Sequence, residues 1–363
     1  MKQEESDRRL EDILKIHFDP EWGSLYWLEK AKQLGFSPLQ EIHTLKDLVL
    51  LGPMEEEPLR KRPIEDFVPR RYRADKSKWV VGETGGMTGL PKRTVFLEDE
   101  FYQAFIHPFV VVAGYRNFPR EQNWLWVGPS GPHIVGKAAT VCAKALGSPE
   151  PFTVDFDPRW VRRFPLDSIG FKRYLDHIIE QTLRIITTQD VKVLFITPKV
   201  LARLKDEMTP KHREALTGIH FAGMELEKDL FQALKDAFPN AVFISGYGNT
   251  LFGMCPEFTG DPARPLDYYP IGPRLIFQTV PLDPEMSPEE KLKQPCSEGE
   301  EGQIVFSRLD KTFLIINQFE RDQGVRITPP EPLRQLNCIG SGIRNPEPLK
   351  TGGGPTLGAT GLY

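Results

Sequence analysis

The stretch 80–96, VVGETGGMTGLPKRTVF, decides how this chain folds. Apolar residues flank a segment of glycines, threonines and one lysine, which predicts a strand, a loop and a second strand. Glycines let backbone N–H groups turn inward on an anion, Thr84 and Thr88 add hydroxyl donors, and Lys92 adds a positive charge. On composition alone, a phosphate-holding loop and a plain hairpin turn with a surface lysine are equal alternatives.

The stretch does not fit two widespread phosphate-binding motifs. A P-loop requires lysine directly after glycine, whereas Lys92 follows Pro91. The glycine pattern of dinucleotide-binding folds, GxGxxG, is absent from the sequence. A phosphate loop at this place therefore belongs to a different kind of site.

Length and composition indicate a folded protein with more than one packed unit. The 363 residues are 40% hydrophobic and 26% charged, with a net charge of −4 and both signs mixed along the chain. No basic stripe marks a nucleic-acid face or a membrane-binding surface. The four cysteines lack CxxC spacing, and the charged N-terminal stretch has no signal-peptide core. We expect a cytoplasmic protein without nucleic-acid or membrane partners and without a metal site of its own.

Strand-like and helix-like segments alternate from Trp79 to about residue 270. The predicted strands are 79–81, 124–127, 193–196, 219–221 and 242–245. The predicted helices are 97–114, 171–188, 198–208 and 226–238. This alternation predicts an α/β fold with a largely parallel sheet that is covered by helices on both faces.

Composition changes along the chain predict its domain organisation. We expect an N-terminal helical segment at 1–77 that packs on the core, an α/β part at 78–270, and a β-rich subdomain at 271–335. The remainder, 336–363, contains the stretch KTGGGPTLGATGLY and is expected to be a glycine-rich tail.

The stretch at 84–92 resembles the signature loop of the adenylate-forming superfamily, which includes acyl- and aryl-CoA ligases, luciferases and amino-acid adenylation domains. That loop is written Ser/Thr-Ser/Thr-Gly-Ser/Thr-Thr-Gly-x-Pro-Lys, and this chain has TGGMTGLPK. The matching positions are Thr84, Gly86, Thr88, Gly89, Pro91 and Lys92. Gly85 and Met87 depart from the pattern, because they stand where the family has hydroxyl side chains.

Two further stretches follow in the order that the family shows. IHFAGMELEKDLFQAL resembles the adenine-binding turn, which Ala222, Gly223, Met224 and Glu225 would form. FISGYGNTLFG resembles the Tyr-Gly-x-Thr-Glu motif, matched by Tyr247, Gly248, Asn249 and Thr250. In the family the tyrosine ring stacks near adenine and the threonine contacts phosphate. Leu251 replaces the glutamate that helps to hold Mg²⁺, and an apolar side chain cannot ligate a hard cation.

The stretch GEEGQIVFSRLDKTFLIINQFERD resembles the family region that ends in the ribose-binding aspartate, and phenylacetate-CoA ligases are the most similar members. Asp322 occupies the aspartate position. A carboxylate suits this role because its two oxygens accept hydrogen bonds from a vicinal diol. IGSGIRN, with Arg344, resembles a remnant of the hinge that precedes the family's C-terminal domain.

The resemblance implies a carboxylate pocket between the signature loop and the Tyr247 turn. WLWVGPSGPHIVGKAA occupies the region that lines this pocket, and Ser245 lies beside the turn. Gly131 and His133 fit a helix start that faces an anion, although a helix-start histidine bonded to backbone explains His133 as well. Trp124 and Trp126 are interpreted as core residues.

The resemblance implies the large N-terminal domain of the adenylate-forming fold, with mostly parallel sheets flanked by helices and a smaller β subdomain. The C-terminal lid domain is expected to be absent, since the sequence ends soon after Asp322. The implied activity is formation of an acyl-adenylate from ATP and an aromatic or other small carboxylate, with Mg²⁺ arriving on ATP. Thr88, Lys92 and Thr250 would stabilise the transferred phosphate, without a thioesterification step.

Short homologues of this type are associated with aromatic natural-product pathways, including the activation of phenazine carboxylate. A downstream acceptor enzyme would then receive the adenylate, and a homodimer is left open. Two alternatives also stay open at this point. In the first alternative, the chain is a nucleotide- or acid-binding protein that keeps the fold without catalysis. In the second, it is an enzyme that takes its C-terminal domain from a separate chain.

Overall fold

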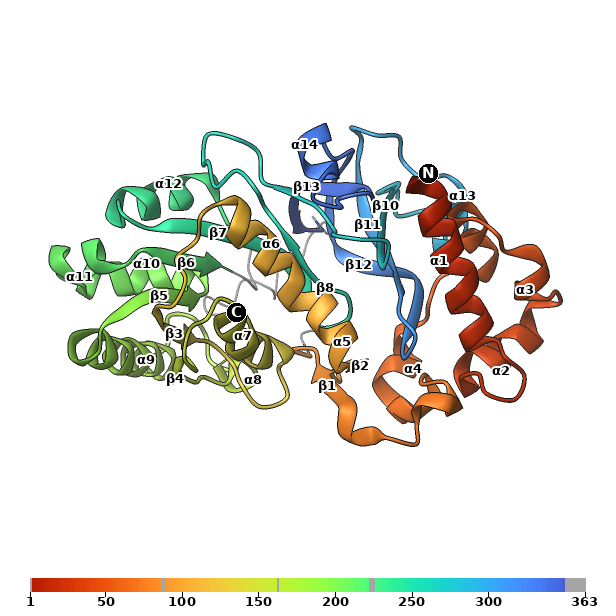
Figure 1. The fold of residues 1–363 in the computed structure, drawn as a ribbon, viewed down its shortest axis with the longest axis horizontal. Coiled ribbons are helices and arrows are strands. Elements are labelled where there is room, and N and C mark those ends of the chain that lie inside the picture. The colour runs from red at the N-terminus through yellow and green to blue at the C-terminus, as the bar shows by residue number, and fades with distance from the viewer. Residues whose placement is uncertain (1, 87–88, 162, 222–225, 350–363) are drawn as a thin grey trace. The chain divides into compact units, whose positions relative to one another are not determined.

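The computed structural model describes residues 2–86, 89–161, 163–221 and 226–349 (Figure 1). Their contacts divide the chain into two compact units. The described residues of the first unit lie within Met1–Gly82, Leu90–Tyr102 and Tyr269–Lys350. Those of the second unit lie within Glu83–Gly89 and Gln103–Tyr268. The helical segment predicted at 1–77 and the β-rich segment predicted from 271 therefore belong to one unit.

The second unit is built on a mostly parallel sheet with strand order β4-β3-β5-β6-β7-β8. These strands are β3 (Asn123–Val127), β4 (Phe152–Val154), β5 (Val191–Ile196), β6 (Gly218–Phe221), β7 (Val242–Asn249) and β8 (Gly253–Pro256). The pairs β3–β4, β3–β5, β5–β6 and β6–β7 are parallel, and β8 pairs antiparallel with β7. The short strand β9 (Asp267–Tyr268) is linked to Glu257 by an isolated bridge.

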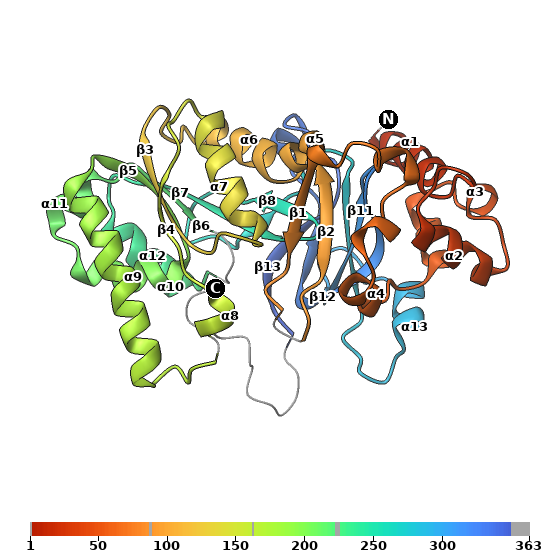
Figure 2. The same cartoon turned by 90° about the horizontal axis from the view of Figure 1, so that it is seen from below.

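Helices cover this sheet on both faces, as the alternation of the sequence predicts. The α-helices of the second unit are α6 (His107–Tyr115), α7 (Ile134–Ala145), α8 (Pro158–Val161), α9 (Ile169–Thr188), α10 (Pro198–Glu207), α11 (Pro210–Ala215) and α12 (Lys228–Ala237). Figure 2 shows α6 and α7 on one side of the strands and α9, α10 and α12 on the other. The π-helical turn η5 (Tyr102–Ile106) precedes α6.

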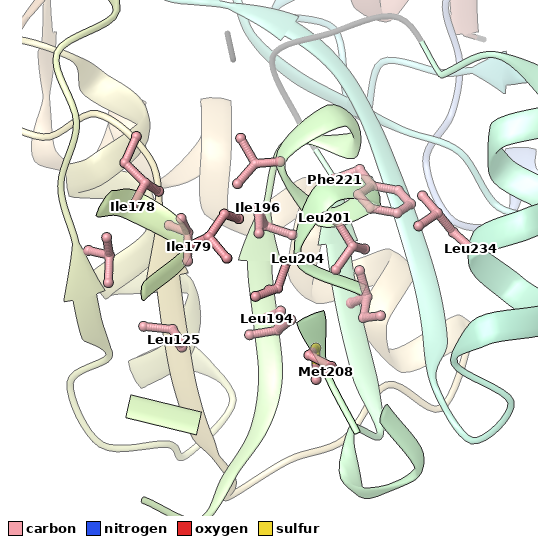
Figure 3. Packing of buried hydrophobic residues seen from close by; sticks show 14 of the residues in the cluster. Leu125, Ile178, Ile179, Leu194, Ile196, Leu201, Leu204, Met208, Phe221 and Leu234 are labelled. Carbon is pink, nitrogen blue, oxygen red and sulfur yellow. The ribbon is translucent and has the colours of Figure 1, made fainter. Parts of the chain in front are cut away.

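The main core of the second unit lies between the sheet and the helices α9, α10 and α12. Alternate residues of β3, β5 and β6 point into this layer, including Leu125, Leu194 and Phe221, and they meet Ile178 of α9 and Leu201 of α10 (Figure 3). All of these side chains are buried. Each buried aliphatic or aromatic side chain stabilises the fold by roughly 1.5–3 kcal/mol, so this layer fixes the strand ends that carry the loops described below.

The first unit combines helices with antiparallel strands. Its helical elements are α1 (Lys2–His17), α2 (Leu25–Leu34), α3 (Pro38–Glu41), η1 (Leu45–Leu51), α4 (Glu56–Lys61), η2 (Ile64–Asp66), η3 (Arg70–Tyr72), η4 (Lys76–Lys78), α5 (Glu98–Phe101), α13 (Pro288–Lys293) and α14 (Glu331–Arg334). Strands β1 (Trp79–Glu83) and β2 (Arg93–Leu97) form a two-stranded sheet. Strands β10 (Leu275–Val280), β11 (Glu301–Leu309), β12 (Leu314–Ile327) and β13 (Gly342–Pro348) pair antiparallel in that order.

A buried ionic network joins distant segments of the first unit around Asp310. Arg274 Nη2 and Arg308 Nε each donate to Asp310 Oδ2 at 2.6 Å. His17 Nε2 lies 2.9 Å from the Asp310 carbonyl oxygen, and Arg9 Nη2 donates to the Leu309 carbonyl at 2.8 Å. Burial alone would raise the pKa of Asp310, but the two arginines outweigh this effect and lower the pKa to about 2. The carboxylate therefore stays charged at neutral pH.

The predicted strands and helices are confirmed in position, with one correction at the C-terminal end. The segment predicted as a tail from 336 contains β13, whose Arg344 is the register partner of Val325 in β12. Asn, Pro and Gly give this segment the composition of a loop, but pairing with β12 satisfies its backbone groups. The stretch that resembles a hinge remnant thus forms the start of a strand.

No helix among the described residues has both the length and the apolar character that a membrane crossing requires.

Candidate functional site

In the second unit, the start of the predicted phosphate loop meets two other loops at Glu83. The Glu83 backbone N–H donates to the Pro132 carbonyl at 3.0 Å, in the loop that follows β3. The Thr250 hydroxyl donates to the Glu83 carbonyl at 3.4 Å, from the turn that follows β7. The structure therefore brings together three segments that the sequence predicts as parts of one site. Ligands of open α/β sheets bind outside the carboxyl ends of the strands, where the loops after β3 and β7 lie.

The residues of the loop itself are half-buried or exposed where they are described. Thr84, Gly85 and Gly86 are half-buried, and Gly89 is exposed. Gly86 has φ +67° and Gly89 has φ +134°, conformations that favour glycine. Thr88 and the variant position Met87 lie outside the described residues, as do Gly223, Met224 and Glu225 of the predicted adenine turn.

Arg159 of α8 holds the start of this loop from a further direction. Its Nη2 donates to Glu83 Oε2 at 3.0 Å and to the Thr84 carbonyl at 3.1 Å. The Glu83 side chain is 21% exposed and that of Arg159 is 33% exposed, so the pair is partly shielded from water. No local sequence pattern indicates Arg159, because the two partners lie 76 residues apart and α8 is a single short turn.

The loop after β3 is fixed by Asp155, which follows β4. Asp155 accepts hydrogen bonds from the Ser130 backbone N–H and from the Ser130 hydroxyl, both at 2.8 Å. Gly131 is exposed with φ +63°, and His133 occupies the N-cap of α7 with its side chain buried. The helix start predicted at His133 is thus confirmed, whereas its contact with an acid substrate stays a prediction.

The turn between β7 and β8 is held by backbone pairing and by the side chain of Asn249. Gly248 pairs with Met254, and a Cβ atom at Gly248 would lie only 2.1 Å from the Gly253 carbonyl oxygen. Asn249 Oδ1 accepts the N–H groups of Leu251 at 2.8 Å and Phe252 at 3.1 Å. Gly248 and Asn249 therefore shape the turn, which leaves Thr250 half-buried and within reach of Glu83.

Tyr247 and Ser245 precede this turn on β7. The Tyr247 ring lies 5.7 Å from Phe252 and 5.9 Å from Tyr268, measured between ring centroids. Ser245 is buried, and its hydroxyl lies 2.8 Å from the Tyr268 hydroxyl. Tyr247 is half-buried and remains a candidate for stacking on a planar ligand.

Leu251 is fully buried in the second unit. The resemblance assigns the Mg²⁺-binding glutamate to this position, but the side chain here is apolar and shielded from water. Asn249, two residues before Leu251, already accepts two N–H groups through its Oδ1. Among the described residues, no group of three His, Cys, Asp or Glu side chains could hold a metal ion. The described residues around this turn therefore do not form a ligand set that fits Mg²⁺.

The face of the sheet that meets α6 and α7 carries aromatic side chains and a neutral histidine. Trp124 and Trp126 are buried, as predicted for core residues. The ring centroid of His220 lies 4.2 Å from that of Phe195, and its Nδ1 lies 3.0 Å from the Ile244 carbonyl oxygen. Burial lowers the pKa of His220 to about 4, although the bond to Ile244 opposes this shift. The imidazole is therefore neutral at pH 7.

In the first unit, Lys92 forms an ion pair at the end of the signature stretch. Its Nζ donates to Glu56 Oε1 at 2.8 Å, and the lysine side chain is only 14% exposed. Glu56 also accepts from Arg60 at 2.5 Å and lies 3.5 Å from Gln318 Nε2. The predicted phosphate-binding lysine is thus paired with an acid of α4 in this structure.

Asp322 lies in the long strand β12 of the first unit. It is half-buried, and Pro348 of β13 is its register partner. The next residue, Gln323, is buried and donates to Glu347 at 3.0 Å. β13 thus supports the backbone on which the predicted ribose-binding carboxylate stands.

No family model matches the chain, and no curated protein sequence matches it. Its fold is similar to that of 2-hydroxyisobutyryl-CoA ligase in complex with 2-HIB-AMP and CoA, in the thioesterification state. The TM-score is 0.59 over 95% of this chain and 66% of the ligase chain, at 14% identity. An open conformation of the same ligase with 2-HIB-AMP and CoA gives a TM-score of 0.58 over 93% of this chain and 72% of that one, at 14% identity.

The chain spans about two thirds of the length of these ligase structures. At this level of identity the likeness concerns the fold and not the reaction. The mixed α/β fold is similar to that of this ligase, in agreement with the fold that the signature stretch predicts. The closer resemblance to phenylacetate-CoA ligases and the absence of a lid domain stay predictions.

Proposed function

We infer that this protein uses ATP to activate a small carboxylate as an acyl-adenylate, with release of pyrophosphate. The observation that carries this inference is the meeting of the loop after β1 with the turn after β7, through Thr250 and Glu83, on a fold shared with 2-hydroxyisobutyryl-CoA ligase. Both segments match adenylate-forming motifs in sequence. A plain hairpin with a surface lysine, the alternative reading of the signature stretch, offers no reason for this contact.

The reaction needs no nucleophile from the protein. A carboxylate oxygen of the substrate attacks the α-phosphorus of ATP, and the bond from that phosphorus to the pyrophosphate oxygen breaks. The protein's tasks are to align the reactants and to stabilise charge on the phosphorus in the transition state. We assign the second task to the N–H groups of the glycine loop, to Thr84, Thr88 and Thr250, and to Lys92. Asp322 would accept hydrogen bonds from the ribose hydroxyls.

We further assign an aromatic carboxylate as the substrate and an aromatic natural-product pathway as the setting, from the resemblance to phenylacetate-CoA ligases. His133, Gly131 and Ser245 are the proposed substrate-side residues. Ser245 would act together with Tyr268, because their hydroxyl groups are already hydrogen-bonded. Transfer of the acyl group to coenzyme A, to another acceptor or to none is a separate question for the assay.

The test is ATP–pyrophosphate exchange with a panel of aryl and aliphatic carboxylates, with mass-spectrometric detection of the adenylate. Lys92→Ala and Asp322→Ala define the background, and Lys211→Ala, at an exposed site on α11, is the control. We expect exchange in the parent and in the control, and a loss of at least about tenfold in the other two variants. Exchange in the parent that does not exceed this background would refute the proposal.

A second function is favoured by the burial of Leu251, which leaves the turn without the acidic side chain of the family motif. The protein would then bind a nucleotide or an aryl acid without turnover. Calorimetry separates the two functions. Binding of ATP or an aryl acid in the absence of exchange supports the binding protein, whereas adenylate formation excludes it.

A further inference from the structure

We propose that Arg159 is a positioning residue of the phosphate loop: it orders the start of the loop and cancels the negative charge of Glu83 beside it. The proposal rests on the nucleotide-binding function proposed above. Arg159 lies outside the motifs of the sequence, and its contacts within the second unit assign it this role.

Arg159 contacts both the side chain of Glu83 and the backbone of Thr84. A single guanidinium nitrogen, Nη2, bridges the Glu83 carboxylate at 3.0 Å and the Thr84 carbonyl at 3.1 Å. Thr84 is the first residue of the signature stretch, so the guanidinium fixes the backbone at the place where the loop leaves β1. Charge-assisted hydrogen bonds of this kind are stronger than those between neutral groups.

Arg159 is itself held in place by the capping of α8. Asp157 caps α8 by accepting the N–H groups of Arg159 at 2.8 Å and Trp160 at 3.2 Å. The Asp157 N–H in turn donates to the Tyr174 hydroxyl of α9 at 3.0 Å. The guanidinium is thus carried by a segment that is anchored to a long helix, as a positioning residue requires.

The same segment of the chain also contacts the loop after β3. The segment 155–159, which we name the brace, also holds Ser130 through Asp155. Glu83 contacts the same loop through its bond to the Pro132 carbonyl. The brace therefore sets the spacing between the phosphate loop and the loop after β3, and both loops flank the proposed substrate position.

The charge of Glu83 gives Arg159 a role beyond local order. A carboxylate next to a phosphate loop repels ATP more strongly than AMP, because ATP carries more negative charge. The guanidinium at 3.0 Å offsets this repulsion. Loss of Arg159 should therefore weaken ATP binding more than AMP binding, which a purely structural role would not do.

The test compares R159A, R159K and the double variant R159A/E83Q with the parent protein. R203A is the matched control, since Arg203 pairs with Glu207 on the surface of α10, at 2.6 Å. Hydrogen exchange of the Glu83 amide is measured without nucleotide, and calorimetry gives the dissociation constants of ATP and AMP. The exchange measurement does not depend on nucleotide binding, so it separates a failure of this proposal from a failure of the proposed function.

We expect R159A to speed exchange of the Glu83 amide and to raise the ratio of the ATP and AMP dissociation constants roughly fivefold. R159K keeps the positive charge but not the shape of the guanidinium. It should therefore preserve the ratio of the ATP and AMP dissociation constants better than it preserves the slow hydrogen exchange of the Glu83 amide. R159A/E83Q should restore the parent's ratio of dissociation constants, while hydrogen exchange at residue 83 should stay fast. R203A should match the parent in both measurements.

If R159A leaves hydrogen exchange of the Glu83 amide unchanged, Arg159 does not order the start of the loop. If it leaves the ratio of the ATP and AMP dissociation constants unchanged, Arg159 does not offset the charge of Glu83. If R159A fails to fold, R159K and the single variant E83Q decide, because E83Q alone should lower the ratio. A parent protein that binds neither nucleotide would refute the proposed function, and the exchange result would still decide whether Arg159 orders the loop.

Discussion

Lys92 and Glu56 form a close ion pair within the first unit, with Nζ 2.8 Å from Oε1. The lysine side chain is mostly buried, and the glutamate is 33% exposed and also binds Arg60. A lysine that is to bind phosphate must exchange this carboxylate for the ligand. The pair therefore places a cost on nucleotide binding that the sequence motif alone does not reveal.

The first prediction concerns Glu56. Glu56→Gln should tighten ATP binding by about threefold to fivefold, because an amide oxygen competes less well than a carboxylate for the Lys92 ammonium. Glu57→Gln is the control, since Glu57 pairs with Lys61 at exposed positions of the same helix. Calorimetry measures both affinities. Unchanged ATP binding in both Glu56→Gln and Lys92→Ala would show that Lys92 is not a phosphate ligand.

The second prediction concerns Leu251. Leu251→Glu should lower the free energy of unfolding by about 3 kcal/mol or more, because it places a carboxylate at a fully buried position. It should not increase ATP–pyrophosphate exchange. Ile169→Glu is the control: its side chain is 73% exposed at the start of α9, and stability should change by less than about 0.5 kcal/mol. Urea unfolding measures both, and an active, equally stable Leu251→Glu variant would contradict the burial argument.

The third prediction concerns the close approach at Gly248. Gly248→Ala should destabilise the second unit by about 2–4 kcal/mol, because its Cβ would meet the Gly253 carbonyl oxygen at 2.1 Å. Gly114→Ala in α6 meets nothing within 4 Å and should raise stability by up to about 1 kcal/mol. Thermal and urea unfolding report both changes. Equal stabilities of the two variants would be the contrary result.

The fourth prediction concerns pH and the buried His220. Burial lowers the pKa of His220 in the folded state to about 4 from its ordinary value of 6.5, so the unfolded chain binds the proton more tightly. The contribution of His220 to stability is complete above pH 6.5, decreases as the pH falls toward 4, and amounts to about 3 kcal/mol over that window.

His220→Leu should therefore flatten the dependence of unfolding free energy on pH between 7 and 4.5. His177→Leu, at an exposed site on α9, should leave the dependence as in the parent. His17 has its pKa lowered to about 4 by burial as well, so some slope should persist in the His220 variant. A parent and a His220→Leu variant with the same slope would rule out the neutral buried imidazole.

Local sequence patterns predict most of the elements of the second unit, since burial on both sheet faces produces continuous apolar runs such as 193–196. They fail at β13, where a run of Asn, Pro and Gly is extended only because β12 lies beside it. A backbone that pairs with a distant strand leaves little trace in its own composition.

The candidate site shows the same division. Gly248 lies near the end of β7 and Thr250 lies in the turn that follows this strand, while their contacts with a nucleotide stay predictions. Arg159 and Glu56 are charged residues without a local pattern, and they become visible only when the fold brings them to Glu83 and Lys92. Leu251 shows a third case, in which the motif gives the position but not the direction of the side chain.

The network around Asp310 has a consequence for the order in which the two units fold during synthesis. Arg9 and His17 in α1 find their partners at Leu309 and Asp310, 300 and 293 residues later in the chain. On a translating ribosome, the residues Gln103–Tyr268 of the second unit emerge before those partners exist. Helix α1 is synthesised before the second unit, yet its contacts with Leu309 and Asp310 can form only after these two residues have emerged.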